Sequence, residues 1–235
     1  HYTLELTQNY VGKRYDTIFT GIPSANLDEH KDDIKEKIGK LKGGMLIRYY
    51  PPKGITANTI AAHIDMVKAT TFSPDLIIVD YADLLMSKNG KRDGNDYQEA
   101  GGIYIDLRAL SGEYQIPIWT ASQTNRSGLE SEIIQADKIA DSYAKVMNAD
   151  FILSISRKDT DKLNNTARFH VMKNRFGQDG MTFQSKMDTN KGIIEVYEKT
   201  ANTSSPNGSS NGQGSGQDIA RKLLQQKYTS TIDLG

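Results

Sequence analysis

The fold of this chain is decided by residues 76–85, which are LIIVDYADLL. An unbroken apolar run closed by an acidic residue is typical of a strand covered on both faces in a parallel sheet. Open α/β sheets bind ligands beyond the carboxyl ends of their strands, so Asp80 is predicted at that edge. There its carboxylate can hold the Mg²⁺ of a nucleotide through water. A buried strand that simply ends in a capping Asp80 explains this stretch equally well by itself.

Strand and helix patterns alternate around this run. Strands are predicted at residues 2–6, 45–50, 76–79, 116–121, 151–156 and 192–197, and helices at 7–20, 28–42, 56–70 and 96–114. Alternating polarity over 167–186, with a glycine-containing bend at 177–180, predicts a β-hairpin. The order predicts an α/β fold with a largely parallel central sheet flanked by helices, followed by the hairpin.

Composition divides the chain into three parts. Residues 1–198 hold the strand and helix patterns and form the predicted domain. Residues 199–216 are mostly Ser, Gly and Asn and predict a flexible linker, the start of a disordered tail. Residues 217–235 contain a short amphipathic helix, predicted at 217–228, that is a candidate docking point for a partner protein.

The totals limit the class of protein. The 235 residues fit one domain with appendages, and Lys+Arg and Asp+Glu both number 29. The net charge therefore does not indicate a nucleic-acid partner. It does not exclude one either, because a ring of subunits can place a few cations on its inner surface. The absence of Cys excludes disulfides and thiolate metal sites, and no apolar run is long enough to span a bilayer. We expect a cytoplasmic protein.

Four further residues have the chemistry and position of a phosphate-processing site. Glu5 ends a predicted strand, where a carboxylate can orient and deprotonate an attacking water. Gln123 ends another strand, where an amide can contact a γ-phosphate. Lys173 and Arg175 are alternate residues of the hairpin and can enter a neighbouring subunit's nucleotide site. Taken singly, Glu5 is more simply a surface Glu and Gln123 a polar strand cap, and a solvated basic edge also explains Lys173 and Arg175.

The order of these motifs resembles the RecA-like motor domain of DnaB-family replicative DNA helicases, most closely those of large tailed phages. The resemblance covers about residues 1–197. It rests on the following motifs: Tyr-Thr-Leu-Glu-Leu at 2–6, Asp-Tyr at 80–81, Ser-Gln-Thr-Asn-Arg at 122–126, Ala-Asp at 149–150 and Lys-Asn-Arg-Phe-Gly at 173–177.

The resemblance implies a hexameric helicase that uses ATP and Mg²⁺ to move on single-stranded DNA. It implies that Glu5 is the catalytic base, Asp80 the Walker B acid and Gln123 the γ-phosphate sensor. Lys173 and Arg175 would act on the adjacent subunit's ATP. Two loops would face the DNA channel, and their candidate phosphate partners are Lys88, Lys91, Arg92, Arg126 and Lys138.

One motif of the family is missing from the sequence. No GxxxxGK[ST] phosphate loop (Walker A) occurs in residues 1–235, and Thr124 replaces the family's usual Leu. An N-terminal truncation explains this most simply, and we expect the fragment alone to be inactive. Two alternatives stay open: a RecA/RadA-type recombinase or KaiC-like ATPase, and a non-catalytic interaction module. The Lys-x-Arg-x-Gly hairpin favours the helicase.

Overall fold

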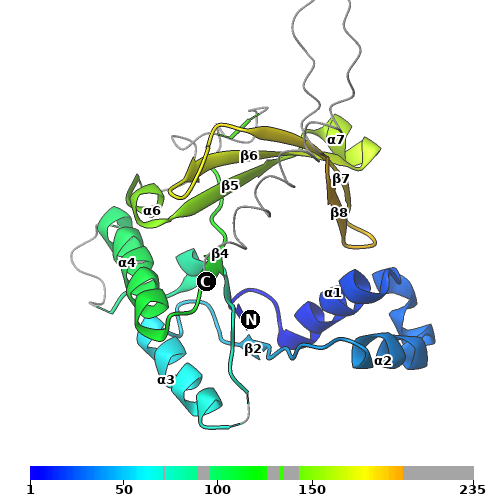
Figure 1. The fold of residues 1–235 in the computed structure, drawn as a ribbon, viewed down its shortest axis with the longest axis horizontal. Coiled ribbons are helices and arrows are strands. Elements are labelled where there is room, and N and C mark those ends of the chain that lie inside the picture. Colours follow the sequence, from blue (N-terminus) through cyan, green and yellow to red (C-terminus); the bar gives the residue numbers. More distant parts are fainter. Residues whose placement is uncertain (71, 89–95, 126–132, 135–142, 198–235) are drawn as a thin grey trace, which may run out of the picture. The chain divides into compact units, whose positions relative to one another are not determined.

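The computed structural model describes residues 1–70, 72–88, 96–125, 133–134 and 143–197 (Figure 1). Several predictions lie outside these residues: the linker, the 217–228 helix, and the candidate DNA contacts Lys91, Arg92, Arg126 and Lys138. All elements described below belong to one compact unit, His1–Tyr197.

Residues 77–80 form an inner strand of a parallel sheet, as predicted, but Leu76 lies outside the strand and is exposed, and Ile78 is only partly buried. The sheet consists of β1 (Tyr2–Thr3), β2 (Arg48–Tyr49), β3 (Ile77–Asp80) and β4 (Ile118–Thr120), in the order β2-β1-β3-β4. All three pairings are parallel, and Thr3 lies opposite Asp80 in the register. The carboxyl ends of β1, β3 and β4 therefore lie side by side at one edge.

The strands are shorter than the apolar patterns predicted. The chain leaves β1 early because the Thr3 hydroxyl donates a hydrogen bond to the carbonyl of Leu6 at 2.7 Å. The predicted strand 45–50 is reduced to β2, and Pro51 and Pro52 follow one residue after it. The sequence pattern identifies residues that can adopt an extended backbone. The strands of the structure include only those residues that hydrogen-bond to a neighbouring strand.

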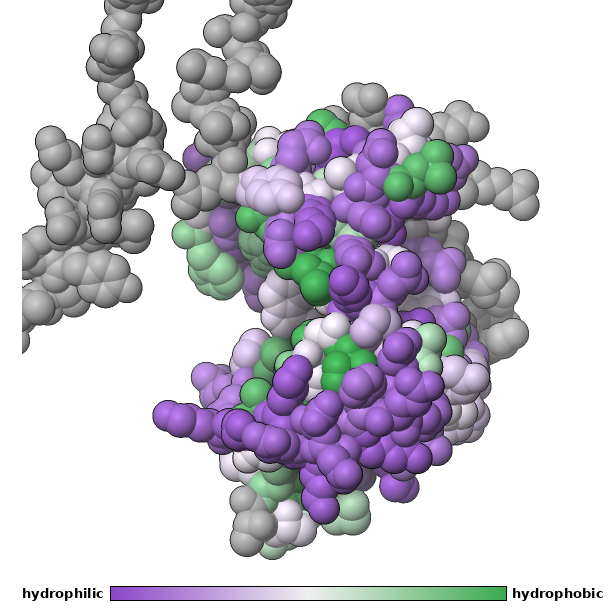
Figure 2. All heavy atoms as spheres, turned by 90° about the vertical axis from the view of Figure 1, so that its right-hand side faces the viewer, coloured by the Kyte–Doolittle hydropathy of each residue, from purple (hydrophilic) through white to green (hydrophobic). Residues whose placement is uncertain are grey.

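Helices and 3₁₀ turns connect these strands: α1 (Gln8–Thr20), η1 (Ser24–Glu29), α2 (Lys31–Gly39), α3 (Ala57–Lys68), η2 (Ala82–Leu84) and α4 (Asp96–Tyr114). Gly21 ends α1 with a left-handed φ of 73°, which favours glycine. The single helix predicted at 28–42 is instead the end of η1 followed by α2. Only Ile34 of α2 is buried, and hydrophilic side chains dominate this side of the molecule (Figure 2).

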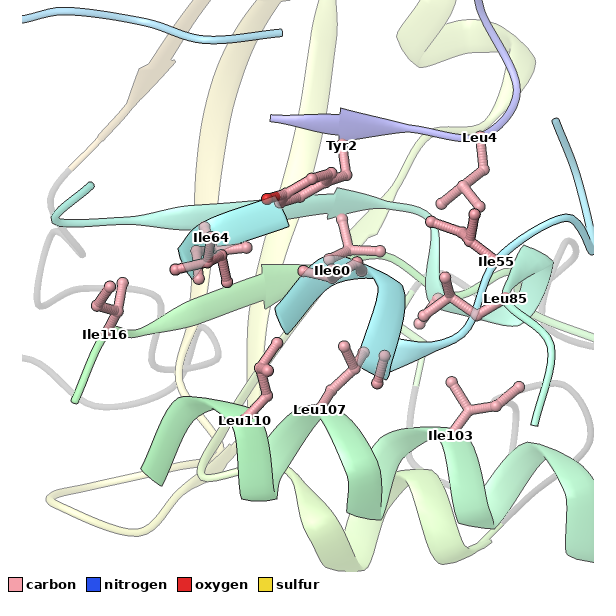
Figure 3. Packing of buried hydrophobic residues seen from close by; sticks show 14 residues of the cluster. Tyr2, Leu4, Ile55, Ile60, Ile64, Leu85, Ile103, Leu107, Leu110 and Ile116 are labelled. Carbon is pink, nitrogen blue, oxygen red and sulfur yellow. The ribbon is translucent and has the colours of Figure 1, made fainter. Parts of the chain in front are cut away.

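Helices α3 and α4 cover one face of the parallel sheet (Figure 3). Ile60 and Ile64 of α3 are almost fully buried against Val79 of β3 and Leu107 of α4. Burying an aliphatic side chain of this size stabilises a fold by roughly 1.5–3 kcal/mol. This packing fixes β3, and with it Asp80, relative to the helices.

A second sheet follows, and it is antiparallel throughout. It contains β5 (Phe151–Ser156), β6 (Thr166–Asn174), β7 (Thr182–Asp188) and β8 (Ile193–Val196), in that order. In the chain, α6 (Tyr143–Asn148) precedes β5, and α7 (Asp159–Asn164) connects β5 to β6. The predicted hairpin is confirmed as β6 and β7. The predicted strand 151–156 is confirmed as β5, but it belongs to this second sheet and not to the parallel one. This strand pairs antiparallel with β6, and Phe151 and Ile155 are exposed.

Asp161 anchors α7 to this sheet and gives a pH-dependent prediction. Its carboxylate accepts hydrogen bonds from the Lys158 backbone N–H at 2.7 Å, from the Thr166 hydroxyl at 3.0 Å and from the Arg168 guanidinium. The Lys158 N–H first, and Arg168 and Thr166 after it, hold the pKa of Asp161 below its ordinary 3.8. A lowered folded-state pKa means that the stabilisation is present above that ordinary value and is lost as the pH falls below it.

We therefore expect Asp161→Asn to lower the free energy of unfolding by roughly 1.5–3 kcal/mol at pH 7, the range for hydrogen bonds to a charged group. The difference from the parent protein should shrink as the pH falls below 4. Urea unfolding followed by Trp119 fluorescence measures it. Asp159→Asn, at a side chain that is 95% exposed, is the control. An equal difference at pH 7 and pH 3 would contradict the ionic origin.

Candidate nucleotide site at the carboxyl edge of the parallel sheet

Backbone and hydroxyl contacts hold the carboxyl ends of three strands together. The Leu4 N–H donates to the Asp80 carbonyl at 2.8 Å, which continues the β1–β3 ladder. The Thr120 hydroxyl donates to the Val79 carbonyl at 2.8 Å and accepts from the Ala82 N–H at 2.9 Å. Thr120 thus joins the end of β4 to the turn after β3.

Three of the predicted site residues meet around Tyr81 at this edge. The Gln123 amide donates to the Tyr81 hydroxyl at 3.2 Å. Burial raises the pKa of Tyr81, and the negative charges of Glu5, Asp83 and Asp80 raise it further. Glu5 is exposed and the Asp80 side chain is 33% exposed, so both carboxylates remain accessible to a ligand. The structure therefore brings Glu5, Asp80 and Gln123 to one edge, with Tyr81 between them.

The donor set at this edge fits one kind of metal site. Within the described ranges, no group of three or more His, Cys, Asp or Glu side chains is placed to hold a metal ion. A cation held entirely by protein ligands is therefore not supported among these residues. Asp80 alone fits Mg²⁺ that takes most of its ligands from phosphates and water.

Sequence reasoning missed a polar cluster directly behind this edge. Asp83 forms an ion pair with Lys145 of α6, whose Nζ lies 2.8 Å from Oδ1. The same carboxylate accepts hydrogen bonds from Ser122 at 3.0 Å and from Tyr104 of α4 at 3.0 Å. Asp83 is part of the run 76–85 and could have been noticed there. Lys145 lies in a polar segment with no motif of its own.

Lys173 lies in β6 and contacts α6, and Arg175 lies in the turn directly after β6 and contacts Asp150. Lys173 Nζ donates to the carbonyls of Val146 at 2.8 Å and Met147 at 3.2 Å. Burial, and then the charge of Arg175, lowers the pKa of Lys173. The Arg175 guanidinium lies 2.6 Å from the Asp150 carboxylate and is 44% exposed. Their action on a neighbouring subunit stays a prediction.

Lys88 is the one candidate DNA contact within the described residues. Its Nζ lies 3.2 Å from Asp106 Oδ1 of α4, and the Lys88 side chain is 36% exposed. The contact with Asp106 positions the side chain at the start of the loop after β3. A role in DNA binding stays a prediction for Lys88.

A cavity of about 290 Å³ lies near the start of β3. Its lining includes His1, Tyr15, Phe72, Leu76 and Ile78. The catalytic candidates Glu5, Asp80 and Gln123 do not line it, but His1 Nε2 lies 3.9 Å from Asp80 Oδ2. Separately, none of the helices described here has the length and apolar character needed to cross a lipid bilayer.

The fold and the residues at the carboxyl edge of the parallel sheet together define an α/β domain. Its candidate ligand site lies beyond the carboxyl ends of adjacent parallel strands. Residues 3–190 match the DnaB-like helicase C terminal domain family, so the chain belongs to that family. The resemblance inferred from the ordered motifs is thereby confirmed.

Two curated proteins illustrate the relationship. The chain is 25% identical over 239 residues to the "DnaB-like replicative helicase" of Enterobacteria phage T4, covering 97% of this chain and 50% of that protein. It is 33% identical over 122 residues to the "Probable plasmid replicative DNA helicase" of Chlamydia muridarum (strain MoPn / Nigg), covering 51% and 26%. The chain thus spans half of the first protein's length and about a quarter of the second's.

Solved structures support the fold. A structure described as an ATPase domain has a TM-score of 0.69 at 19% identity and covers 84% of this chain and 73% of its own. A structure described as that of a DnaB-like replicative helicase and its interactions with primase has a TM-score of 0.68 at 16% identity, with coverages of 82% and 49%. The predicted RecA-like α/β class, with its parallel sheet and C-terminal antiparallel hairpin, is confirmed.

Proposed function

We propose that this chain is the motor part of an ATP-dependent replicative DNA helicase that works as a homo-hexamer. In this proposal the assembled protein translocates on single-stranded DNA and unwinds duplex during phage DNA replication. The observation that carries the proposal is the convergence of Glu5, Asp80 and Gln123 at one edge of the sheet, in a chain of the DnaB-like helicase family. The helicase activity of the whole protein is itself proposed.

The side chains at this edge suit hydrolysis of the ATP γ-phosphate. Glu5 accepts a proton from water while the water oxygen attacks the γ-phosphorus. The bond to the β-phosphate oxygen breaks, and ADP and phosphate leave. Asp80 would hold a Mg²⁺ ion through water, and the ion would supply positive charge to neutralise the phosphates. Gln123 contacts the γ-phosphate, and its link to Tyr81 passes the state of the nucleotide to the turn after β3.

Lys173 and Arg175 complete the site of an adjacent subunit in this proposal. Lys173 lies in β6, and Arg175 lies directly after it, partly exposed beside Asp150. A cation supplied in trans stabilises the charge that develops on the transferred phosphoryl group. The loops after β3 and β4 face the single-stranded DNA, with Lys88, Lys91, Arg92, Arg126 and Lys138 as candidate phosphate partners.

The test is ATP turnover by this chain alone and by the chain joined to the sequence encoded upstream of it. We expect turnover by the longer protein, stimulated by single-stranded DNA, because a phosphate loop supplies the backbone donors that grip the phosphates. The stimulation should weaken as salt rises, since phosphate contacts release counterions. An upstream sequence that contains a phosphate loop, combined with no turnover under any of these conditions, would favour a non-catalytic interaction module.

A primase or a helicase loader is the proposed protein partner. The support is a solved relative whose description names its interactions with primase. The same assay tests this with the cognate primase added to the longer protein and to a version lacking residues 199–235. Stimulation that persists without residues 199–235 would assign the contact to the domain instead of the tail.

A further inference from the structure

Lys145 is a charged residue in a buried position, where charged side chains are rare. Its side chain is 4% exposed, and it lies in α6, a helix of six residues. A buried ammonium group is tolerated only where a counter-charge and hydrogen-bond acceptors surround it. Asp83 at 2.8 Å supplies the charge, the Ser122 hydroxyl at 3.1 Å accepts a hydrogen bond, and the Tyr104 ring lies 5.6 Å from Nζ.

These partners come from segments far apart in the chain that together form the candidate site. Asp83 follows Asp80 by three residues, in the turn after β3. Ser122 immediately precedes Gln123, in the segment after β4. The Ser122 hydroxyl donates to Asp83 and accepts from Lys145, so it closes a ring of contacts among the three residues.

Few contacts of its own side chain hold Gln123 in place. It is exposed, and its hydrogen bond to Tyr81 spans 3.2 Å. The position of its amide therefore depends on how firmly the preceding residue is held. Thr120 and Ser122, on either side of Ala121, tie this segment to the turn after β3.

We propose that Lys145 is a positioning residue that, through Asp83 and Ser122, holds the Gln123 segment against the turn that follows Asp80. The role in ATP turnover rests on the proposed function, whereas the holding role does not. Lys145 touches no reacting atom, and it acts through the placement of Gln123. A misplacement of about 1 Å at a reacting geometry can lower a rate by roughly 100-fold.

Hydrogen exchange of the chain tests the holding role without ATP. In Lys145→Met, backbone amides of 120–125 should exchange at least tenfold faster than in the parent, while β5 and β6 keep their protection. Ser122→Ala removes only an exposed hydroxyl and should give the same local change at smaller size, so it remains informative if Lys145→Met does not fold. Unchanged exchange at 120–125 in both variants, or a uniform increase throughout, would overturn the proposal.

ATP turnover of the longer protein tests the role in positioning. We expect Lys145→Met to lower kcat about 10- to 100-fold with KM for ATP within twofold, and Lys145→Arg to restore most of kcat. Lys162→Met is the matched control, since Lys162 also lies in a six-residue helix but is 61% exposed. Exchange that changes as expected while kcat does not would overturn the positioning role alone. Absence of turnover in the parent protein would instead count against the proposed function.

Discussion

Arg175→Ala is expected to lower ATP turnover of the assembled helicase by roughly 10³–10⁵-fold, the range for a phosphoryl-transfer arginine supplied in trans. Arg175 is 44% exposed at the end of β6, so a neighbouring subunit can approach its guanidinium. Affinity for ATP should change little, because the arginine stabilises charge that develops in the transition state. Steady-state turnover and equilibrium binding of a fluorescent ATP analogue measure the two quantities.

Arg14→Ala is the matched control for that experiment. Arg14 is an exposed arginine of α1, outside the set of candidate site residues. Its replacement should leave turnover within about twofold, as expected for a surface substitution. If Arg175→Ala retained turnover close to the parent protein, the arginine would be structural, held by its ion pair with Asp150.

Glu5→Gln is expected to lower kcat by roughly 10²–10⁴-fold, the usual contribution of a general base. Glutamine keeps the size of the side chain and removes the group that accepts the proton. Because Glu5 is exposed and follows a strand held by the Leu4–Asp80 hydrogen bond, the substitution should leave the fold intact. Rapid-quench measurement of the hydrolysis step, beside Glu29→Gln as a control on an exposed 3₁₀ turn, separates chemistry from product release.

A slowed hydrolysis step with normal ATP binding would support the role of Glu5 as base. The outcome against it is a variant whose hydrolysis step matches the parent protein while product release or binding changes. In that case another group at this edge, such as the carboxylate of Asp83, would have to be considered for proton transfer.

The sequence predicted the parallel sheet because its signal is local. Residues 76–80 contain an apolar run and an acid in five consecutive positions, and Glu5 and Gln123 follow closely after the strands on either side. The parallel arrangement of neighbouring strands then places their ends at one edge. The hairpin of β6 and β7 was predictable for the same reason, since alternation and a glycine-containing bend are both local patterns.

Other features depend on contacts between distant segments. The strand 151–156 begins with three apolar residues, as the run at β3 does, and nothing in those residues says that its partner is the antiparallel β6. The ion pair of Asp83 with Lys145 joins residues 62 positions apart, and no periodicity links them. Likewise, the Tyr81 contact of Gln123 follows from the register of β3 and β4, which a single sequence does not fix.

The central claim is that Glu5 of one subunit and Arg175 of its neighbour serve the same ATP. Mixing Glu5→Gln subunits with Arg175→Ala subunits tests it most directly, because each variant alone is expected to be inactive. In a mixed ring, an intact Glu5 on one subunit can face an intact Arg175 on the next. We predict ATP turnover that exceeds the sum of the two variants and is highest near equal proportions. Turnover that stays at the sum of the two at every ratio, in rings shown to contain both subunits, would contradict the claim.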